Sequence, residues 1–98
     1  MRVDVSGPDG GTAIVTVIGE LDISNVERLE EAVAPVVENK PARLVVDIRD
    51  LRFADTSAIA VWMRWAARVE RLELRDASPL LRQIITSMGL AGKLQLTG

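Results

Sequence analysis

Short runs of aliphatic and β-branched residues alternate along this chain with segments whose apolar residues recur at helical spacing. The run that constrains the fold most is LVVDI, at residues 44–48, because it lacks the apolar–polar alternation of a half-exposed strand. A short apolar run of this kind is typical of a parallel strand that is buried on both faces. Such a strand needs helices to cover its sheet, which favours an α/β fold.

The other elements follow from the same patterns. Residues 1–5 and 12–18 are expected to form strands joined by a turn rich in Gly and Pro, which favours an antiparallel hairpin. Further strands are expected at residues 72–75 and 94–96, and helices from residue 24, over 57–69 and between 78 and 89. The order β-β-α-β-α-β-α-β predicts a single α/β domain over residues 1–98. Its mixed, mostly parallel sheet of four to five strands would have helices packed on it.

Three helix ends carry recognisable signals. Ser24 is followed three residues later by Glu27, which is the capping-box pattern of a helix start. Ser78 and Pro79 place a capping hydroxyl before a proline at the first helical position. Gly89 is expected to end that helix in a left-handed conformation.

The residue types that the chain lacks exclude several classes of function. It contains neither Cys nor His, so it has no thiolate nucleophile, no imidazole base and no Cys or His zinc site. We therefore expect no catalysis, no metal and no cofactor. With 12 Lys and Arg against 14 Asp and Glu, it lacks the basic character of a nucleic-acid binder. No apolar run is long enough for membrane insertion, so a cytoplasmic protein is expected.

Polar residues gather where the strand over 44–48 leads into the next helix. The connection over residues 49–56 would leave the C-terminal end of a parallel strand, where open α/β sheets place their ligand sites. It ends in Asp55 and Thr56, directly before Ser57. One interpretation is that these residues cap the helix. The other is that Ser57 accepts a phosphoryl group, whose negative charge a helix N-terminus tolerates.

The helix over 57–69 has more apolar residues than one buried face requires. A helical wheel places its core side at Ile59, Trp62, Met63 and Ala66. Ser57 and Val61 fall on the solvent side with Arg64, and Trp65 lies on its flank. Exposed apolar residues beside an exposed hydroxyl predict a docking surface for a partner protein. The alternative for Trp65 is that it lies against a neighbouring helix.

Four motifs, in their order and spacing, resemble those of STAS domains, and above all of the bacterial anti-sigma-factor antagonists. They are GELD at residues 19–22, LVVDI at 44–48, FADTS at 53–57 and ASP…MGL between 77 and 90. The resemblance covers nearly the whole chain, from Val3 to Leu96. It implies a single STAS-like domain.

In that family an anti-sigma factor, which is a serine-protein kinase, phosphorylates a hydroxyl in a motif of the form Asp-Ser-Ser-Gly or Asp-Ser-Thr-Gly. The unphosphorylated antagonist binds the anti-sigma factor, the phosphorylated form releases it, and a phosphatase resets the switch. The resemblance implies that Ser57 is the phosphoacceptor, with Thr56 as the alternative, and that Ala58 occupies the Gly position. It also implies that Asp22 and Asp55 contact the partner or orient the acceptor. The predicted partner-binding residues are Asp22, Asp55, Thr56, Ser57, Ala58, Val61, Arg64 and Trp65.

Two other functions stay open. Some STAS domains are constitutive subunits that dock on the ATPase of a lipid-transport complex, and their motif resembles Asp-Thr-x-Gly-Leu. Residues 55–59, DTSAI, are close to that pattern. An enzyme would instead need Asp22, Asp47, Asp50 and Asp55 to gather around Mg²⁺, which prefers oxygen ligands. The absence of a base and of a Gly-rich phosphate loop makes this the least favoured reading.

Overall fold

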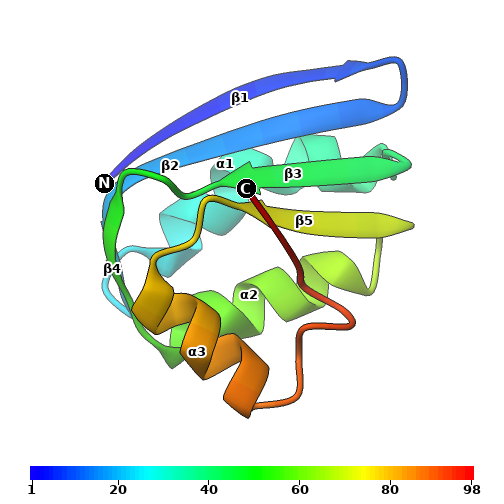
Figure 1. The fold of residues 1–98 in the computed structure, drawn as a ribbon. Helices are drawn as coiled ribbons and strands as arrows, with labels where there is room; N and C mark the ends of the chain where they lie inside the picture. Colours follow the sequence, from blue (N-terminus) through cyan, green and yellow to red (C-terminus); the bar gives the residue numbers. More distant parts are fainter.

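The computed structural model describes residues 1–98, and all the predicted strands and helices are present, with one additional strand. The strands are β1 (Arg2–Asp9), β2 (Thr12–Leu21), β3 (Arg43–Asp47), β4 (Leu51–Ala54), β5 (Arg71–Arg75) and β6 (Gln95–Thr97). The helices are α1 (Val26–Glu38), α2 (Thr56–Ala66) and α3 (Pro79–Ser87). The strand order is β1-β2-β3-β5-β6, with only β1 antiparallel to its neighbour (Figure 1). The predicted mixed, mostly parallel α/β sheet is confirmed.

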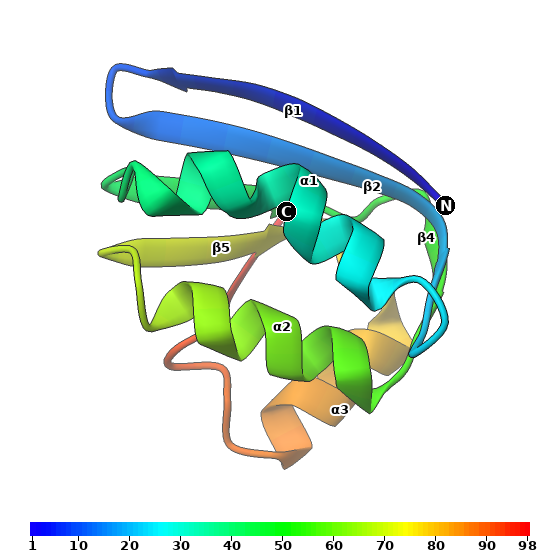
Figure 2. The same ribbon diagram turned by 180° about the vertical axis from the view of Figure 1, so that it is seen from behind.

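Helices α1 and α2 lie next to each other on one face of the sheet (Figure 2). Alternate residues of the three central strands point to these helices and are almost completely buried: Ala13, Val15, Val17, Leu44, Val46, Leu72 and Leu74. Helix α3 lies apart from this pair, beside β4 and the start of α2 (Figure 1). Hydrophobic surface is buried between the sheet and these two helices, and this burial holds α1 and α2 on the sheet.

The β1–β2 hairpin is longer than predicted. Strand β1 continues to Asp9 instead of ending near residue 5, and only Gly10 and Gly11 form the turn. Both glycines have positive φ, at 60° and 83°. Two-residue hairpin turns of the type that matches strand twist need this conformation, which glycine adopts without steric cost.

The connection predicted over residues 49–56 contains a strand, β4, that the sequence analysis missed. Strand β2 pairs with β3 only from Thr12 to Thr16, so its C-terminal end has a free edge. After β3 the chain returns to this free edge, and β4 pairs there in parallel with Gly19–Leu21 of β2. Four residues are too few to show a strand pattern, and β4 forms because the long β2 offers it a partner.

The start of α1 also differs from the prediction. The prediction of a capping box at Ser24 is wrong, because α1 begins at Val26 with Asn25 at the N-cap position. The Asn25 side chain instead holds the preceding turn: its Oδ1 accepts from the Asp22 amide at 3.0 Å, and its Nδ2 donates to the Glu20 carbonyl at 2.9 Å. Since β2 extends to Leu21, the next residues are needed for the turn. The predicted cap of α3 is confirmed, with Ser78 Oγ accepting from the Leu81 amide at 3.2 Å.

One acidic side chain is buried in the sheet. Glu73 of β5 is 3% exposed, and the Arg43 guanidinium of the neighbouring strand β3 donates two hydrogen bonds to it, one of them at 3.0 Å. Arg71 lies 3.8 Å from the same carboxylate. The hydrogen bonds from Arg43 hold the pKa of Glu73 below its ordinary value, outweighing the opposing effect of burial.

This pair predicts a dependence of stability on pH. Because the pKa of Glu73 is lower in the folded than in the unfolded chain, its carboxylate stabilises the fold above the ordinary carboxyl pKa, and that contribution is lost as the pH falls through the folded value. Glu73→Gln is expected to lower the free energy of unfolding by about 1.5–3 kcal/mol at neutral pH. Urea unfolding between neutral pH and about pH 3 should show a flatter pH profile for the variant. Equal slopes for the two proteins would contradict the assignment.

Candidate partner-binding site

The predicted site lies where β2 and β4 end side by side. Leu21 and Ala54 are partners in the parallel pairing of these strands, so Asp22 and Asp55 leave the sheet at the same edge. The Asp55 amide donates to the Leu21 carbonyl at 3.2 Å and ties the two chain segments together. The expected proximity of Asp22 to the segment around Asp55 is therefore confirmed.

Asp55 is the N-cap residue of α2. Its Oδ1 accepts a hydrogen bond from the Ser57 amide at 2.9 Å and a second one from the Ser57 hydroxyl. The capping interpretation is thus confirmed for Asp55. Thr56, the first residue of the helix, is exposed, and Ser57 is half-buried. The hydroxyl of Ser57 is accordingly held in a defined orientation, whereas no side-chain hydrogen bond holds that of Thr56.

The carboxyl group of Asp55 is kept in its charged form. The hydrogen bond from the Ser57 hydroxyl lowers the pKa of Asp55 below its ordinary value, and the backbone amides of Ser57, Ala58 and Ile23 act in the same direction against partial desolvation. A carboxylate with a lowered pKa is a weak base. Asp55 can therefore orient the hydroxyl of Ser57, but it is poorly suited to remove its proton.

The turn after β2 repeats this arrangement. Asp22 Oδ1 accepts from the Ser24 amide at 2.9 Å and from the Ser24 hydroxyl, as Asp55 does with Ser57. The two turns share the sequence pattern Asp-x-Ser, which is the signal in the sequence for this arrangement. Because Asp22 is engaged with Ser24, the orientation of the Ser57 hydroxyl depends on Asp55.

The predicted docking surface on α2 is wrong in three of its residues. Val61 and Ala58 are completely buried, and Trp65 is only 4% exposed. The helical wheel assumed that α2 buries one face, against the sheet. In the structure a second face packs against α1, and Val61 and Trp65 belong to it.

The packing of α1 beside α2 determines the surroundings of Trp65 and Arg64. Trp65 lines a crevice between the helices with Ala34 and Val37 of α1, so the alternative interpretation of this residue is confirmed. Arg64 is exposed as predicted, and its guanidinium donates to the Glu30 carboxylate of α1 at 3.0 Å. The methyl group of Ala58, at the position of the family's Gly, is buried in the core and leaves the approach to Ser57 open.

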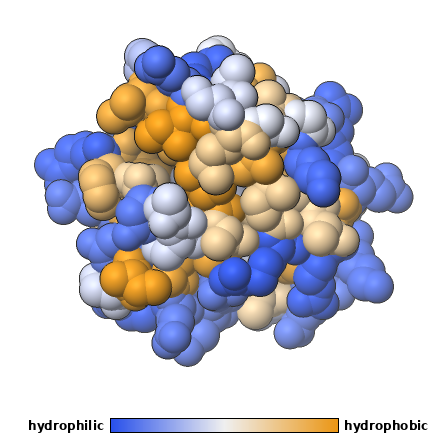
Figure 3. Space-filling model, turned by 90° about the horizontal axis from the view of Figure 1, so that it is seen from below, coloured by the Kyte–Doolittle hydropathy of each residue, from blue (hydrophilic) through white to orange (hydrophobic).

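Exposed apolar side chains do occur near Ser57, on other elements. Ile23 follows Asp22 and is 77% exposed, Phe53 of β4 is 52% exposed, and Leu80 of α3 is 68% exposed. We call these three residues the apolar trio. Figure 3 shows the molecule from the side of α2 and α3, with apolar surface between hydrophilic patches. The sequence analysis missed the trio because it assigned Phe53 to a loop and Leu80 to an ordinary helix.

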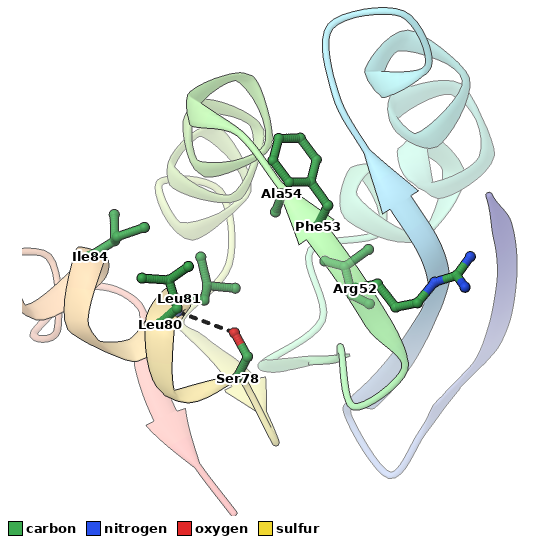
Figure 4. Close-up of a pocket in the computed structure, with 8 residues that line it drawn as sticks. Arg52, Phe53, Ala54, Ser78, Leu80, Leu81 and Ile84 are labelled. Atoms are coloured by element: carbon green, nitrogen blue, oxygen red, sulfur yellow. Dashed lines mark hydrogen bonds between the residues drawn. The ribbon is translucent and has the colours of Figure 1, made fainter.

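Two members of the trio border a groove between β4 and α3 with a volume of about 150 Å³. Phe53 and Ala54 contribute one wall, and Leu80, Leu81 and Ile84 contribute the other (Figure 4). The guanidinium of Arg52 points away from the groove, and the Ser78 hydroxyl is occupied by the cap of α3 (Figure 4). Apart from these two residues the lining is apolar, and its wall on β4 ends at Ala54, directly before Asp55.

The carboxylates proposed for an enzyme do not form a metal site. No three acidic side chains are grouped so that they could hold a metal ion, although Asp22, Asp47, Asp50 and Asp55 all lie at or just after the ends of strands. Asp47 Oδ1 accepts from the Arg49 amide at 3.1 Å and stabilises the turn after β3. None of the three helices is long and apolar enough to cross a lipid bilayer.

The fold is shared with solved structures of anti-sigma factor antagonists. One from Mycobacterium paratuberculosis superposes with a TM-score of 0.86 at 23% identity, covering 98% of this chain and 84% of that chain. SpoIIAA in its unphosphorylated form gives 0.73 at 19% identity, covering 87% and 82%. The phosphorylated form of SpoIIAA, a Bacillus cell fate determinant, gives 0.76 at 19% identity, covering 99% and 92%.

A comparison with curated proteins gave no match. The family model described as "Mlab, STAS domain" matches residues 4–97, which is nearly the whole chain. The match includes every strand and helix that forms the site, from β2 to α3. This chain therefore belongs to the STAS domain family.

Proposed function

We propose that this chain is an anti-sigma-factor antagonist. While unphosphorylated it sequesters an anti-sigma factor that is a serine-protein kinase, and it releases that partner when Ser57 is phosphorylated. The observation that carries the proposal is the Ser57 hydroxyl, which Asp55 orients at the start of α2, next to the paired ends of β2 and β4 with their exposed Ile23 and Phe53. A protein of the same fold, SpoIIAA, has been solved in unphosphorylated and phosphorylated forms, which supports a switch of this kind.

The chemical step needs a partner, because the chain has neither a strong base nor a Gly-rich phosphate loop. In the proposed reaction Ser57 Oγ bonds to the γ-phosphorus of ATP held by the kinase. The bond between that phosphorus and the leaving oxygen of ADP breaks, and a base of the kinase takes the hydroxyl proton. Asp55 orients the hydroxyl through its hydrogen bond. A phosphatase would later hydrolyse the serine phosphate and restore the binding form.

The location of Ser57 explains how modification could change binding without unfolding the domain. The second residue of α2 lies where the amides and dipole of the helix tolerate negative charge. A phosphate there adds about −1.5 to −2 charges to a surface that the partner would have to desolvate. Burying that charge without a counter-ion is costly, so the complex would dissociate.

The proposed contact surface has a polar centre and apolar edges. Asp22, Asp55, Thr56 and Ser57 form the centre, and the apolar trio takes the place that sequence analysis gave to Val61 and Trp65. Because exposed aromatic and aliphatic side chains commonly anchor protein interfaces, Phe53 is the expected main anchor. Ala58 is buried and is therefore not part of this surface, and the exposed Arg64 is paired with Glu30 of α1.

Replacing Phe53 tests this surface. Phe53→Ser is expected to weaken partner binding by tenfold or more, in the range of an interface anchor. The free energy of unfolding should change by less than about 1 kcal/mol, because half of the ring is exposed in the free protein. Val5→Ser is the matched control, since Val5 is also apolar and 40% exposed but lies on the β1–β2 hairpin. Equal binding of the partner by the two variants would show that Phe53 is not part of the contact surface.

The first experiment on function is to measure the intact mass of the protein isolated from its own cells, with and without phosphatase treatment. The modified peptide is then mapped. A phosphate on Ser57 is the expected result. A chain that stays unmodified under all growth conditions while bound to its partner would contradict the switch.

A second candidate function is a constitutive subunit that docks on the ATPase of a lipid-transport complex. The observation that favours it is Thr56, which is exposed at the first position of α2 within a run resembling Asp-Thr-x-Gly-Leu. Such a subunit would stay bound whatever the state of Ser57. Neighbouring genes distinguish the two candidates: a sigma factor and a kinase support the first, and transporter components support the second.

A further inference from the structure

The Asp55 carboxylate depends on Ser57 for two hydrogen bonds. Oδ1 accepts one from the Ser57 amide, at 2.9 Å, and one from the Ser57 hydroxyl. When Ser57 Oγ bonds to phosphorus it loses its hydrogen and can no longer donate. Phosphorylation therefore removes one of the two hydrogen bonds and places phosphoryl oxygens directly beside the carboxylate.

No ion pair neutralises the Asp55 carboxylate beside which this second anion would lie. The ion pairs of the molecule involve Asp4, Glu30, Glu73 and Asp76, and none involves Asp55 or Asp22. Two unpaired negative charges a few ångströms apart repel each other appreciably near a protein surface. Asp55 and a phosphate on Ser57 therefore cannot both keep the positions that the unmodified protein gives them.

The amides at the start of α2 decide which anion is favoured. In the unmodified protein the Ser57 amide donates to the Asp55 carboxylate at 2.9 Å, and the Ala58 amide donates to the Asp55 main-chain carbonyl at 3.1 Å. A phosphate brings about twice the charge of a carboxylate and three acceptor oxygens to the same helix end. Helix N-termini bind phosphate well because their free N–H groups and their dipole both favour negative charge.

We infer that phosphorylation of Ser57 displaces Asp55 from the N-cap of α2 and that the phosphoryl group takes over the cap. This inference rests on the proposed function, in which Ser57 is the modified residue. The Asp55 amide donates to the Leu21 carbonyl at 3.2 Å, so the displacement reaches the turn after β2 that carries Ile23 of the apolar trio. The cap thus connects modification of Ser57 to the shape of the contact surface.

The experiment compares Asp55→Asn in the unmodified chain and in a chain with phosphoserine incorporated at position 57 during translation. Asparagine is a good N-cap without charge, so the variant retains the cap in the unmodified chain, and in the phosphorylated chain it yields the cap to the phosphate without a second anion beside it. In the unmodified chain we expect the ratio of folded to unfolded protein to stay the same or to fall slightly. In the phosphorylated chain we expect that ratio to rise roughly tenfold, as for the removal of one close like charge. Urea unfolding measures both.

Asp22→Asn is the matched control. Asp22 holds Ser24 as Asp55 holds Ser57, but it is not bonded to the modified residue. Its substitution should change the ratio of folded to unfolded protein by the same factor whether or not Ser57 carries a phosphate. Asp55→Ser, which also supplies a capping oxygen, serves if the asparagine variant folds poorly.

An Asp55→Asn effect that is equal in both chains, or a loss of stability in the phosphorylated one, would overturn the inference. The measurement uses the chain alone, without a kinase or a partner. Its failure is therefore distinguishable from failure of the proposed function, which would appear as an unmodified Ser57 in cells or as a partner that ignores the phosphate.

Discussion

Trp65→Ala is expected to lower the free energy of unfolding by about 3–5 kcal/mol, the cost of removing a large aromatic side chain from a core. Trp65 is 4% exposed and lies between α2 and α1, against Ala34 and Val37. Removing its ring would leave a cavity between two helices that are both anchored on the sheet and cannot readily close together. The loss should be visible as a lower urea midpoint with an unchanged slope.

Arg64→Ala provides the control for this result. Arg64 is the preceding residue of the same helix, and its exposed ion pair with Glu30 should contribute less than about 1 kcal/mol. If Trp65→Ala changed stability as little as Arg64→Ala and instead abolished partner binding, Trp65 would belong to a docking surface after all. The two variants therefore separate a core residue from a surface residue on one helix.

Ser57→Glu is expected to weaken binding of the anti-sigma factor by about 100-fold or more. The glutamate places a charge at the centre of the proposed surface, where a bound partner would leave it desolvated and unpaired, at a cost of about 3–5 kcal/mol. The fold should be retained, because the second position of a helix favours a negative charge. Titration calorimetry with an anti-sigma factor encoded near the gene measures the effect.

Ser57→Ala separates the added charge from the loss of the hydroxyl. It removes the hydrogen bond to Asp55 without adding charge and should bind the partner nearly as well as the unmodified chain. Undiminished binding by Ser57→Glu would contradict the switch and favour the constitutive subunit. A loss in both variants would show that the hydroxyl itself contacts the partner.

The regular elements could be predicted because their signals are local. The strand expected over residues 44–48 is β3, displaced by one residue. It could be predicted because a short run of Leu and Val is typical of a buried strand. The cap at Ser78 and the end of α3 at Gly89 are also as expected, with Gly89 at a φ of 73°. These features depend on residues within one helical turn of each other.

The missed features depend on residues far apart in the sequence. Strand β4 exists because β2 is longer than β3 and leaves a free edge, and nothing within residues 51–54 reveals that. The length of β2 also requires Ser24 for a turn instead of a helix cap. Of the candidate site, the sequence identified Asp22, Asp55, Thr56 and Ser57, because their polar types recur at the ends of strands and starts of helices.

The sequence alone determined the class of fold, the location of the polar site and the absence of any Cys thiol or His imidazole. Periodicity indicates which residues of a helix share a face, but it does not indicate how many faces are covered. That was decided by the tertiary structure, in which α1 packs beside α2 on the sheet and buries Val61 and Trp65. The tertiary structure also decided the location of the apolar trio. Pairing of β2 with β4 brings Ile23 and Phe53 to one edge of the sheet, and Leu80 of α3 lines the same groove as Phe53.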